Sequence, residues 1–277
     1  MRSARFAVLA AVLLAIMFAA SSGLQPGHGV DPEKALQAAF NASANVKFSA
    51  KQMWSWVMNG RRLQQEIEVQ SPGLHSFNQQ AVELVRRNYT PLVEGEDIIA
   101  GRRTWVIRLK PHTKYTPWKQ LWIDCETGVV LAMRDWDSHN RIKSAMRTLS
   151  ISYTDVRPEF DQETVTQLSS SDQSRCLDIS RMKNIPHPQY VPRGYKLVRV
   201  KKIGRAGSMQ LVYSDGLYSL SVFLRFPDGQ GGEQNKIKRA YDWGQGLVLS
   251  TYNAERNIVV VGDLPLTEIE RIALSVR

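Results

Sequence analysis

AGRRTWVIRLKPHTKYTPWKQLWIDCETGVVLAM, residues 100–133, carries the clearest pattern of strands and turns in the chain. A turn at Gly101 opens one strand and Pro111 ends it, a second strand runs to the turn at 124–128, and a third strand follows at once. Glycine and proline are the residues that most often punctuate strands. The stretch therefore predicts a meander of antiparallel strands, and the whole chain is expected to be α+β, mostly antiparallel β.

The first residues have the layout of a secretory signal peptide. Arg2 and Arg5 precede an uncharged apolar run at 7–20, and the small residues of 21–23 follow. Positive, apolar and small regions in this order predict export and removal of residues 1–23. The apolar run is shorter than the roughly 20 residues of a membrane span. The mature chain is therefore expected to be soluble and periplasmic, or otherwise extracytoplasmic, with an uncleaved anchor helix as the alternative.

The chain is basic. Its 277 residues carry a formal net charge of +10, which falls to +8 when Arg2 and Arg5 leave with the signal peptide. A basic surface suits an anionic partner such as a membrane surface, a phosphorylated glycolipid or an acidic protein segment. Nucleic acid fits the charge but not the export signal, so no nucleic-acid partner is expected. Oligomeric state does not follow from these features.

A hairpin is predicted around Asn59-Gly60. Apolar residues alternate with polar ones before this dipeptide and again after it. Asn-Gly is the strongest short hairpin signal because both central residues of the turn need positive φ. A two-residue turn sets the register, and the apolar residues of both strands then share one face. The predicted pairs are Met58 with Arg61, Trp56 with Leu63, Gln52 with Ile67, Ala50 with Val69 and Lys51 with Glu68.

Residues 30–157 are expected to form the first domain. Asp31 is a good N-cap and Pro32 suits the first helical position, so a helix should begin there and end near Asn45. A second short helix is expected at 79–89. Further strands are expected at about 92–94, 104–110, 119–124 and 129–136, followed by one that ends near Tyr153.

The polar stretch 158–184 has the composition of a linker, and residues 185–277 are expected to form a second, smaller α+β domain. Thr267 and Glu270 have the spacing of a capping box, so a closing helix should begin at Thr267. Ile269, Ile272, Ala273 and Val276 would form its buried stripe. Strands are expected at about 195–203, 208–213, 217–226, 236–243, 247–252 and 257–261.

No catalytic constellation or metal-binding motif is found. The five histidines are spread singly along the chain, and no nucleophile motif or phosphate-binding loop is present. Asp135 and Asp137 flank Trp136, and a turn-closing role is expected for them. Cys125 and Cys176 can form a disulfide in an oxidising compartment, although two free thiols fit equally well. The protein is therefore predicted to be a binding protein and not an enzyme, with no cofactor and no metal.

The tryptophans suggest what is bound. Six of the seven fall within 30–157. A curved sheet with many large apolar side chains can enclose a ligand cavity, although ordinary packing against a helix fits them as well. An acyl chain contributes about 0.8 kcal/mol per buried methylene. The candidate lipid-binding residues, chosen by sheet face, are Trp54, Trp56, Leu63, Ile67, Trp105, Ile107, Leu121 and Ile123.

Several motifs resemble a known family. Asn88-Tyr89, Ala100-Gly101-Arg102 and the strands of 105–111 and 121–128 are similar to the lipoprotein carriers LolA and LolB. They resemble more closely the N-terminal domain of the periplasmic sigma-E regulators RseB and MucB. The C-terminal domain of those regulators is similar to segments 192–195, 211–217 and 261–265.

This resemblance implies an unclosed β-barrel with helices in its concavity, followed by the smaller α+β domain. It also implies a regulatory protein that binds the extracytoplasmic segment of an anti-sigma factor and senses envelope lipid or lipoprotein acyl chains. Proximity to the membrane surface would fit that role. The alternative is a periplasmic lipid or lipoprotein carrier of LolA/LolB type, for which a domain beyond Ile185 is not needed.

Overall fold

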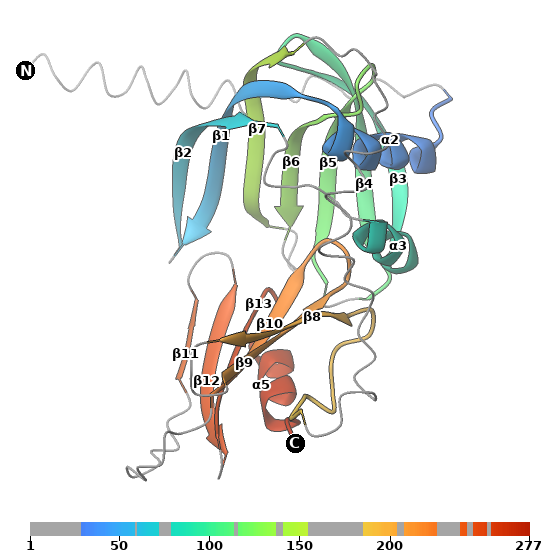
Figure 1. The fold of residues 1–277 in the computed structure, drawn as a ribbon. Coiled ribbons are helices and arrows are strands. Elements are labelled where there is room, and N and C mark those ends of the chain that lie inside the picture. The colour runs from blue at the N-terminus through green and yellow to red at the C-terminus, as the bar shows by residue number, and fades with distance from the viewer. Residues whose placement is uncertain are drawn as a thin grey trace, which may run out of the picture.

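Two antiparallel sheets, each with its own helical layer, build the molecule in the computed structural model (Figure 1). We call residues 29–154 the N-terminal unit and residues 185–277 the C-terminal unit. The α+β, mostly antiparallel class expected from the sequence is confirmed. The structure describes residues 29–58, 60–71, 79–113, 116–136, 141–154, 185–203, 208–225, 239–242, 246–253 and 256–277.

The N-terminal unit contains a seven-stranded sheet in the order β2-β1-β7-β6-β5-β4-β3. The sheet curves strongly but does not close, because β2 and β3 are its two edges (Figure 1). It is the unclosed barrel that the family resemblance implied. Its strands are β1 (Phe48–Met58), β2 (Arg61–Gln70), β3 (Tyr89–Ile99), β4 (Arg102–Pro111), β5 (Trp118–Asp124), β6 (Val130–Trp136) and β7 (Ile142–Tyr153).

The predicted hairpin is confirmed in register. β1 and β2 pair so that all five expected partners face each other, including Trp56 with Leu63 and Lys51 with Glu68. The opposite edge of β1 pairs with β7. The alternation of apolar and polar residues therefore does place one side of the hairpin on the concave face of the sheet.

Helix α2 (Pro32–Asn45) lies in the concavity of the sheet (Figure 1). The Asp31 carboxylate accepts a hydrogen bond from the backbone N–H of Glu33 at 2.9 Å, and proline occupies the first turn, as expected. The helix ends at the residue predicted. Its buried stripe packs against β4 and β5 and consists of Ala35, Leu36, Ala39 and Phe40.

Strand β3 is much longer than the strand expected at 92–94. The register between β3 and β4 shifts between Val93 and Gly95, which leaves Glu94 as an extra residue. Such a bulge breaks the two-residue period. The alternation that predicts a strand is therefore interrupted in the middle of this one. The short helix before it, α3 (Gln79–Asn88), lies where it was expected.

The C-terminal unit contains a six-stranded sheet in the order β11-β12-β13-β10-β9-β8, with helix α5 (Leu266–Leu274) packed on it. The six strands expected from the sequence are present, each within a few residues of its predicted place. They are β8 (Lys196–Ile203), β9 (Ser208–Ser214), β10 (Ser219–Arg225), β11 (Arg239–Asp242), β12 (Leu247–Asn253) and β13 (Arg256–Gly262).

The predicted capping box of the closing helix is wrong. Pro265 is the N-cap of α5, and no side chain caps the helix. The carbonyl oxygen of Pro265 instead accepts the first backbone N–H bonds, from Glu268 at 3.0 Å and Ile269 at 3.1 Å. Thr267 thus lies inside the first turn. The buried stripe is confirmed, because Ile269, Ile272, Ala273 and Val276 are all in the core.

Several predicted features lie outside the described residues. They are the signal peptide (1–23), the linker (158–184), Asp137 and Cys176. The proposed domain boundaries therefore stay predictions. Among the helices that the structure describes, none combines the length and the apolar character of a membrane span.

Candidate functional site

A continuous apolar row crosses the concave face of the N-terminal unit. Residues directly opposite each other in neighbouring strands share a face. The strand registers place one residue from each of six neighbouring strands, in the sheet order β1, β7, β6, β5, β4 and β3, in a single line. This row consists of Trp54, Met146, Met133, Leu121, Ile107 and Val93.

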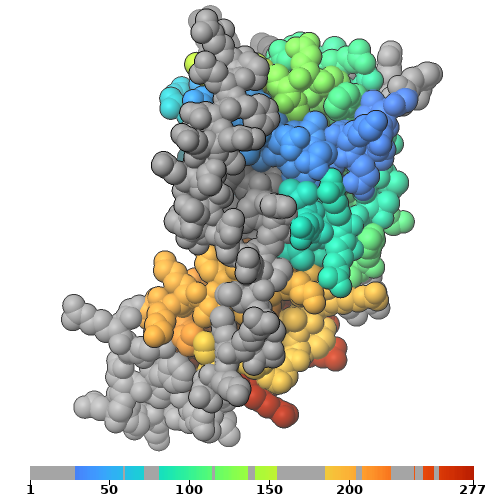
Figure 2. All heavy atoms as spheres, turned by 45° about the vertical axis from the view of Figure 1, so that its right-hand side comes forward, coloured from blue at the N-terminus to red at the C-terminus, as the bar shows by residue number. Residues whose placement is uncertain are grey.

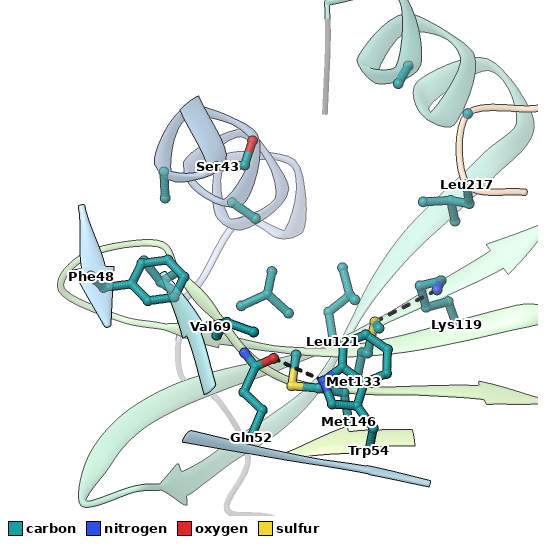
Figure 3. Close-up of a pocket in the computed structure, with 16 residues that line it drawn as sticks. Ser43, Phe48, Gln52, Trp54, Val69, Lys119, Leu121, Met133, Met146 and Leu217 are labelled. Atoms are coloured by element: carbon teal, nitrogen blue, oxygen red, sulfur yellow. Dashed lines mark hydrogen bonds between the residues drawn. The ribbon is translucent and has the colours of Figure 1, made fainter. Parts of the chain in front are cut away.

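A cavity of about 270 Å³ lies between this row and helix α2 (Figure 3). Phe48 and Val69 lie at one end of it, whereas Lys119 and Leu217 lie at the other. Its volume is close to the lower end of ordinary ligand pockets, about 300 Å³. The described lining residues are Ala39, Ala42, Ser43, Phe48, Gln52, Trp54, Val69, Ala81, Lys119, Leu121, Val129, Val130, Met133, Met146, Gly216 and Leu217.

The lining is mostly apolar, and its few polar side chains already have partners. The Gln52 side-chain oxygen accepts a hydrogen bond from Trp54 Nε1 at 3.1 Å. Lys119 Nζ lies 2.6 Å from an Asp135 carboxylate oxygen, and the Ser43 hydroxyl donates to the carbonyl of Phe40. A hydrocarbon chain gains free energy from such walls, about 0.8 kcal/mol per buried methylene, whereas a polar group would lose its hydration. The cavity therefore suits an acyl chain.

The eight predicted lipid-binding residues lie in three places. Trp54 and Leu121 line the cavity. Ile107 and Ile123 are fully buried in the apolar cluster under α2, and Trp105 is half-buried against it. The remaining three, Trp56, Leu63 and Ile67, lie half-buried on the β1–β2 hairpin, outside the lining. As a lipid-binding set, the eight stay a prediction.

Sequence reasoning missed several lining residues. Met133 and Met146 face each other on β6 and β7 and belong to the apolar row. Their alternation along two expected strands was a usable signal, although methionine is less conspicuous than tryptophan. Leu217 lies in the other unit, between β9 and β10, and no local pattern connects it to this sheet.

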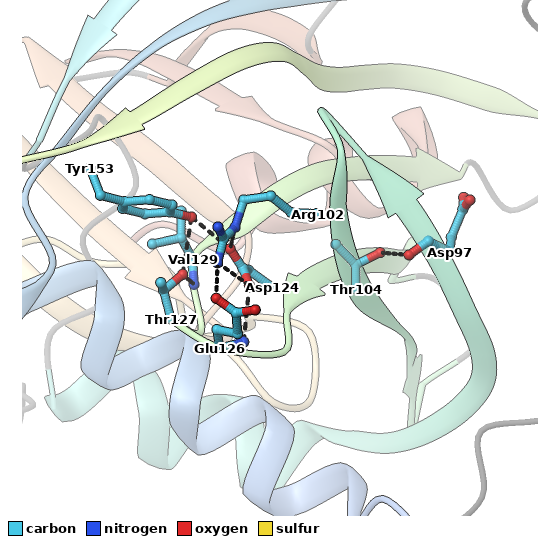
Figure 4. A network of polar contacts seen from close by, with 8 residues as sticks. All are labelled: Asp97, Arg102, Thr104, Asp124, Glu126, Thr127, Val129 and Tyr153. Carbon is cyan, nitrogen blue, oxygen red and sulfur yellow. Dashed lines mark hydrogen bonds and ion pairs between the residues drawn. The ribbon is translucent and has the colours of Figure 1, made fainter.

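A polar network holds the turn at 124–128, directly before Val129, which lines the cavity (Figure 4). Arg102 forms an ion pair with the buried Asp124 carboxylate and a second one with Glu126 at 2.7 Å. Tyr153 donates a hydrogen bond to Asp124 at 2.7 Å. Burial works against the charge of Asp124, but the hydrogen bonds from Arg102, the Glu126 N–H and Tyr153 outweigh it and keep its pKa below the ordinary value. This turn is therefore held as an ionised cluster.

The expected turn-closing role of Asp135 is wrong. Asp135 lies within β6, and its carboxylate accepts hydrogen bonds from the hydroxyls of Ser144 at 2.6 Å and Tyr218 at 2.8 Å. Burial again opposes ionisation, yet the nearby ammonium group of Lys119 prevails, so the pKa of Asp135 is lowered. Because Tyr218 belongs to the C-terminal unit, this carboxylate joins the two units. The sequence contained no signal for that pairing.

A second buried aspartate, Asp215 of the C-terminal unit, also joins the two units. Tyr89 donates a hydrogen bond to the Asp215 carboxylate at 2.7 Å. The side-chain amide of Asn88 donates to the carbonyl oxygens of Gly194 at 3.0 Å and Asp215 at 2.8 Å. Burial raises the pKa of Asp215 despite these bonds. An ion pair between Lys143 and Asp263 is a further polar contact between the units.

The described residues offer no metal centre, because no group of three or more His, Cys, Asp or Glu side chains is placed to hold an ion. Cys125 is half-buried and carries a free thiol in the structure. Cys176 lies outside the described residues, so the pairing of the two cysteines is untested.

Comparison with known protein families gives two matches in chain order. Residues 40–169 match the MucB/RseB N-terminal domain, and residues 186–277 match the MucB/RseB C-terminal domain. Together the two matches cover most of the chain. Among curated proteins, the Sigma-E factor regulatory protein RseB of Haemophilus influenzae is 22% identical over 191 residues. That alignment covers 66% of this chain but only 58% of the relative.

Solved structures show the same fold. A complex of Pseudomonas aeruginosa MucA/MucB superposes with a TM-score of 0.62 at 17% identity, covering 90% of this chain and 99% of that chain. MucB in complex with MucA(peri) gives a TM-score of 0.60 at 18% identity, covering 89% and 98%. The two MucB structures therefore share the fold of both units, the seven-stranded sheet and the smaller C-terminal unit.

Proposed function

The chain belongs to the MucB/RseB family, and we propose that it is an exported regulatory protein that binds the extracytoplasmic segment of an anti-sigma factor. We further propose that an envelope lipid or lipoprotein acyl chain, held in the cavity, changes that binding. The apolar cavity between α2 and the row of Trp54, Leu121 and Met133 carries the lipid part. The partner class is supported by the relatives, whose MucB members were solved with MucA.

The mechanism is a shift between two populations of the protein. A ligand changes binding at a second site only when it favours one conformation over another. The cavity is small, so an acyl chain that fills it must favour a conformation with more room. If the anti-sigma segment favours the unfilled conformation, lipid releases it. The protein would then report a lipid signal without catalysing a reaction.

A periplasmic lipid carrier of LolA/LolB type is the alternative. A carrier has to load and unload its cargo and needs only the sheet with its helices. Here the C-terminal unit contributes Gly216 and Leu217 to the lining. That contribution favours a protein in which cavity occupancy affects a second unit, which is what a regulator requires.

Calorimetric titration can test both parts of the proposal. The mature chain is titrated with the extracytoplasmic segment of the MucA-type anti-sigma factor of its own organism, with and without a diacylated lipopeptide. The same peptide without acyl chains serves as the control ligand. We expect the segment to bind, and the acylated ligand to weaken that binding at least tenfold. No binding of the segment in either condition would overturn the regulatory role.

Two variants make the test specific for the cavity. Met133→Trp fills the cavity from the apolar row, because Met133 is a buried lining residue. Ile98→Trp adds the same indole on β3, where Ile98 is 64% exposed. The response to lipopeptide should disappear in the first variant and persist in the second. An equal response in both variants would place the lipid elsewhere.

A further inference from the structure

The loop 215–218 of the C-terminal unit is part of the cavity wall. It connects β9 to β10 and lies directly beneath the N-terminal unit, near β5 and α3 (Figure 1). Figure 2 shows the C-terminal unit, in yellow and orange, pressed against the N-terminal unit above it. Gly216 and Leu217 line the cavity, and Leu217 and Tyr218 pack against the apolar cluster under α2. This loop of the C-terminal unit therefore packs against the core of the N-terminal unit.

Gly216 brings this loop into backbone contact with α3. Its φ is +107°, and a Cβ there would lie 2.6 Å from the Val85 nitrogen and 2.7 Å from the Ala81 oxygen. Such distances leave no room for any side chain. The loop and the helix touch directly, so a displacement of one is transmitted to the other.

Hydrogen bonds hold the loop in this place from both sides. The Asp215 carboxylate accepts a hydrogen bond from the hydroxyl of Tyr89, the first residue of β3 after α3. The Tyr218 hydroxyl donates a hydrogen bond to Asp135 on β6. Asp135 is also the partner of Lys119, which itself lines the cavity. Lys119 and Leu217 line the same end of the cavity. Lys119 is the ion-pair partner of Asp135, and Leu217 is next to Tyr218, so both are direct neighbours of residues that join the units.

The other walls of the cavity are much harder to move. Its floor is a sheet in which the five inner strands, β1, β7, β6, β5 and β4, are hydrogen-bonded on both sides. The α2 wall is a helix with a fully buried apolar stripe. The loop wall is instead held by side-chain contacts between separate units, and Ala81 of α3, which also lines the cavity, lies against it. Packed interfaces of this kind respond to strain by switching arrangement, not by gradual deformation.

We infer that an acyl chain entering the cavity displaces Leu217 and its loop and so loosens the contact between the two units. The inference rests on the proposed function, because it assigns the regulatory signal of that same cavity to the loop 215–218. Lipid occupancy at the N-terminal sheet is thereby reported by the C-terminal unit, which offers a separate surface to a protein partner.

Hydrogen exchange of the unmodified mature chain tests this directly. The backbone N–H groups of Leu217 and Tyr218 donate to the Asp215 carboxylate at 3.0 and 2.8 Å, so their exchange reports the state of the loop. Palmitate below its micelle concentration is the probe, and native mass spectrometry measures its binding. We expect peptides covering 215–222 to exchange at least fivefold faster with palmitate bound. Peptides from β4, at 102–111, should be unchanged or slower.

The outcomes separate the two proposals. Palmitate that binds while the loop is unchanged or better protected would overturn the loop inference and leave the lipid cavity standing. Absence of palmitate binding would overturn the lipid part of the proposed function together with the inference. A ligand that merely stabilises the protein slows exchange everywhere. Faster exchange in the loop, with unchanged or slower exchange in β4, cannot arise in that way.

Two variants sharpen the result. Leu217→Ala removes the side chain from the cavity and should raise palmitate affinity severalfold while reducing the exchange response to less than half. Leu266→Ala, at a 40% exposed position on α5 of the same unit, is the matched control and should change neither. Tyr218→Phe keeps the ring but loses the hydrogen bond to Asp135, so the unliganded loop should exchange roughly fivefold faster. Wild-type behaviour of both loop variants would contradict the inference.

Discussion

Two turns of this molecule, 124–128 and 215–218, have the same construction. Each begins with a buried aspartate whose carboxylate accepts a backbone N–H of the turn and a tyrosine hydroxyl. Each also contains a glycine with positive φ that lies against the backbone of a helix, Gly128 against α2 and Gly216 against α3. Val129, directly after the first turn, lines the cavity, and so do Gly216 and Leu217 of the second turn.

The two turns differ in what surrounds the aspartate. Asp124 is paired with Arg102 of its own unit, and its pKa is lowered. Asp215 forms no ion pair with any described residue, and burial raises its pKa. Its tyrosine partner, Tyr89, belongs to the other unit. The same turn is thus held by an ion pair within one unit at 124–128 and by a hydrogen bond between the two units at 215–218.

Gly128→Ala should have the largest effect on stability. A Cβ at this position would lie 2.6 Å from the Ala38 carbonyl oxygen, and φ is +75°. Left-handed strain and overpacking together should cost about 3 kcal/mol of unfolding free energy, measured by urea denaturation. Gly101→Ala is the control, because φ is +76° there and nothing lies within 4 Å. It should cost about 1–2 kcal/mol, from strain alone. Equal losses in both variants would contradict the packing argument.

Asp124→Asn should cost about 2 kcal/mol at neutral pH, because charge-assisted hydrogen bonds are lost in a buried cluster. The pKa of Asp124 is lowered by folding, so the unfolded chain binds the proton more readily. Its contribution is therefore complete above the ordinary aspartate pKa and is lost as pH falls through the folded value. Denaturation curves of wild type and variant should converge as the solution is acidified. A difference independent of pH would rule out this ionisation.

Gly216→Ala should separate the units with little loss of stability in either. The new Cβ would meet α3 backbone atoms at 2.6–2.7 Å, and the loop can avoid them by moving away. We expect a larger radius of gyration by small-angle scattering and a loss of only about 1–2 kcal/mol in unfolding free energy, from left-handed strain at φ +107° alone. Gly60→Ala, at φ +73° with nothing within 4 Å, should leave the radius unchanged. Global unfolding of the Gly216 variant would show that this contact is not separable.

The smallest effects are expected from the two tyrosines. Tyr153→Phe and Tyr89→Phe each remove one hydrogen bond to a turn aspartate, worth about 1 kcal/mol. Only the first should lower the unfolding free energy of the N-terminal unit. The second should instead appear as faster hydrogen exchange in 208–225. A lower unfolding free energy in Tyr89→Phe, with faster exchange in 208–225 only in Tyr153→Phe, would contradict the difference between the two turns.

Local patterns predicted most of the fold. The β1–β2 hairpin followed from Asn59-Gly60 and alternating residues, and α2 followed from Asp31 and Pro32. Strand β3 was underestimated because the bulge at Glu94 breaks the period. The start of α5 was misplaced because Pro265, without a side-chain hydrogen bond, caps it in place of Thr267.

The candidate site was predictable only in part. Trp54 and Leu121 were identified because strand alternation shows which residues share a face. Leu217, Asp215 and Tyr218 approach the cavity through the packing of one unit on the other, and no spacing within either unit contains that information. Likewise, Asp135 looks like a turn residue in sequence because its partner, Tyr218, is 83 positions away.

Equilibrium dialysis of palmitate against the mature chain tests whether the space beneath α2 holds an acyl chain. Wild type and Ile98→Trp should saturate at about one molecule per chain. Met133→Trp, whose indole takes up the space, should bind at least tenfold more weakly. Equal binding by all three proteins, or no saturable binding by wild type, would contradict acyl-chain binding in this space.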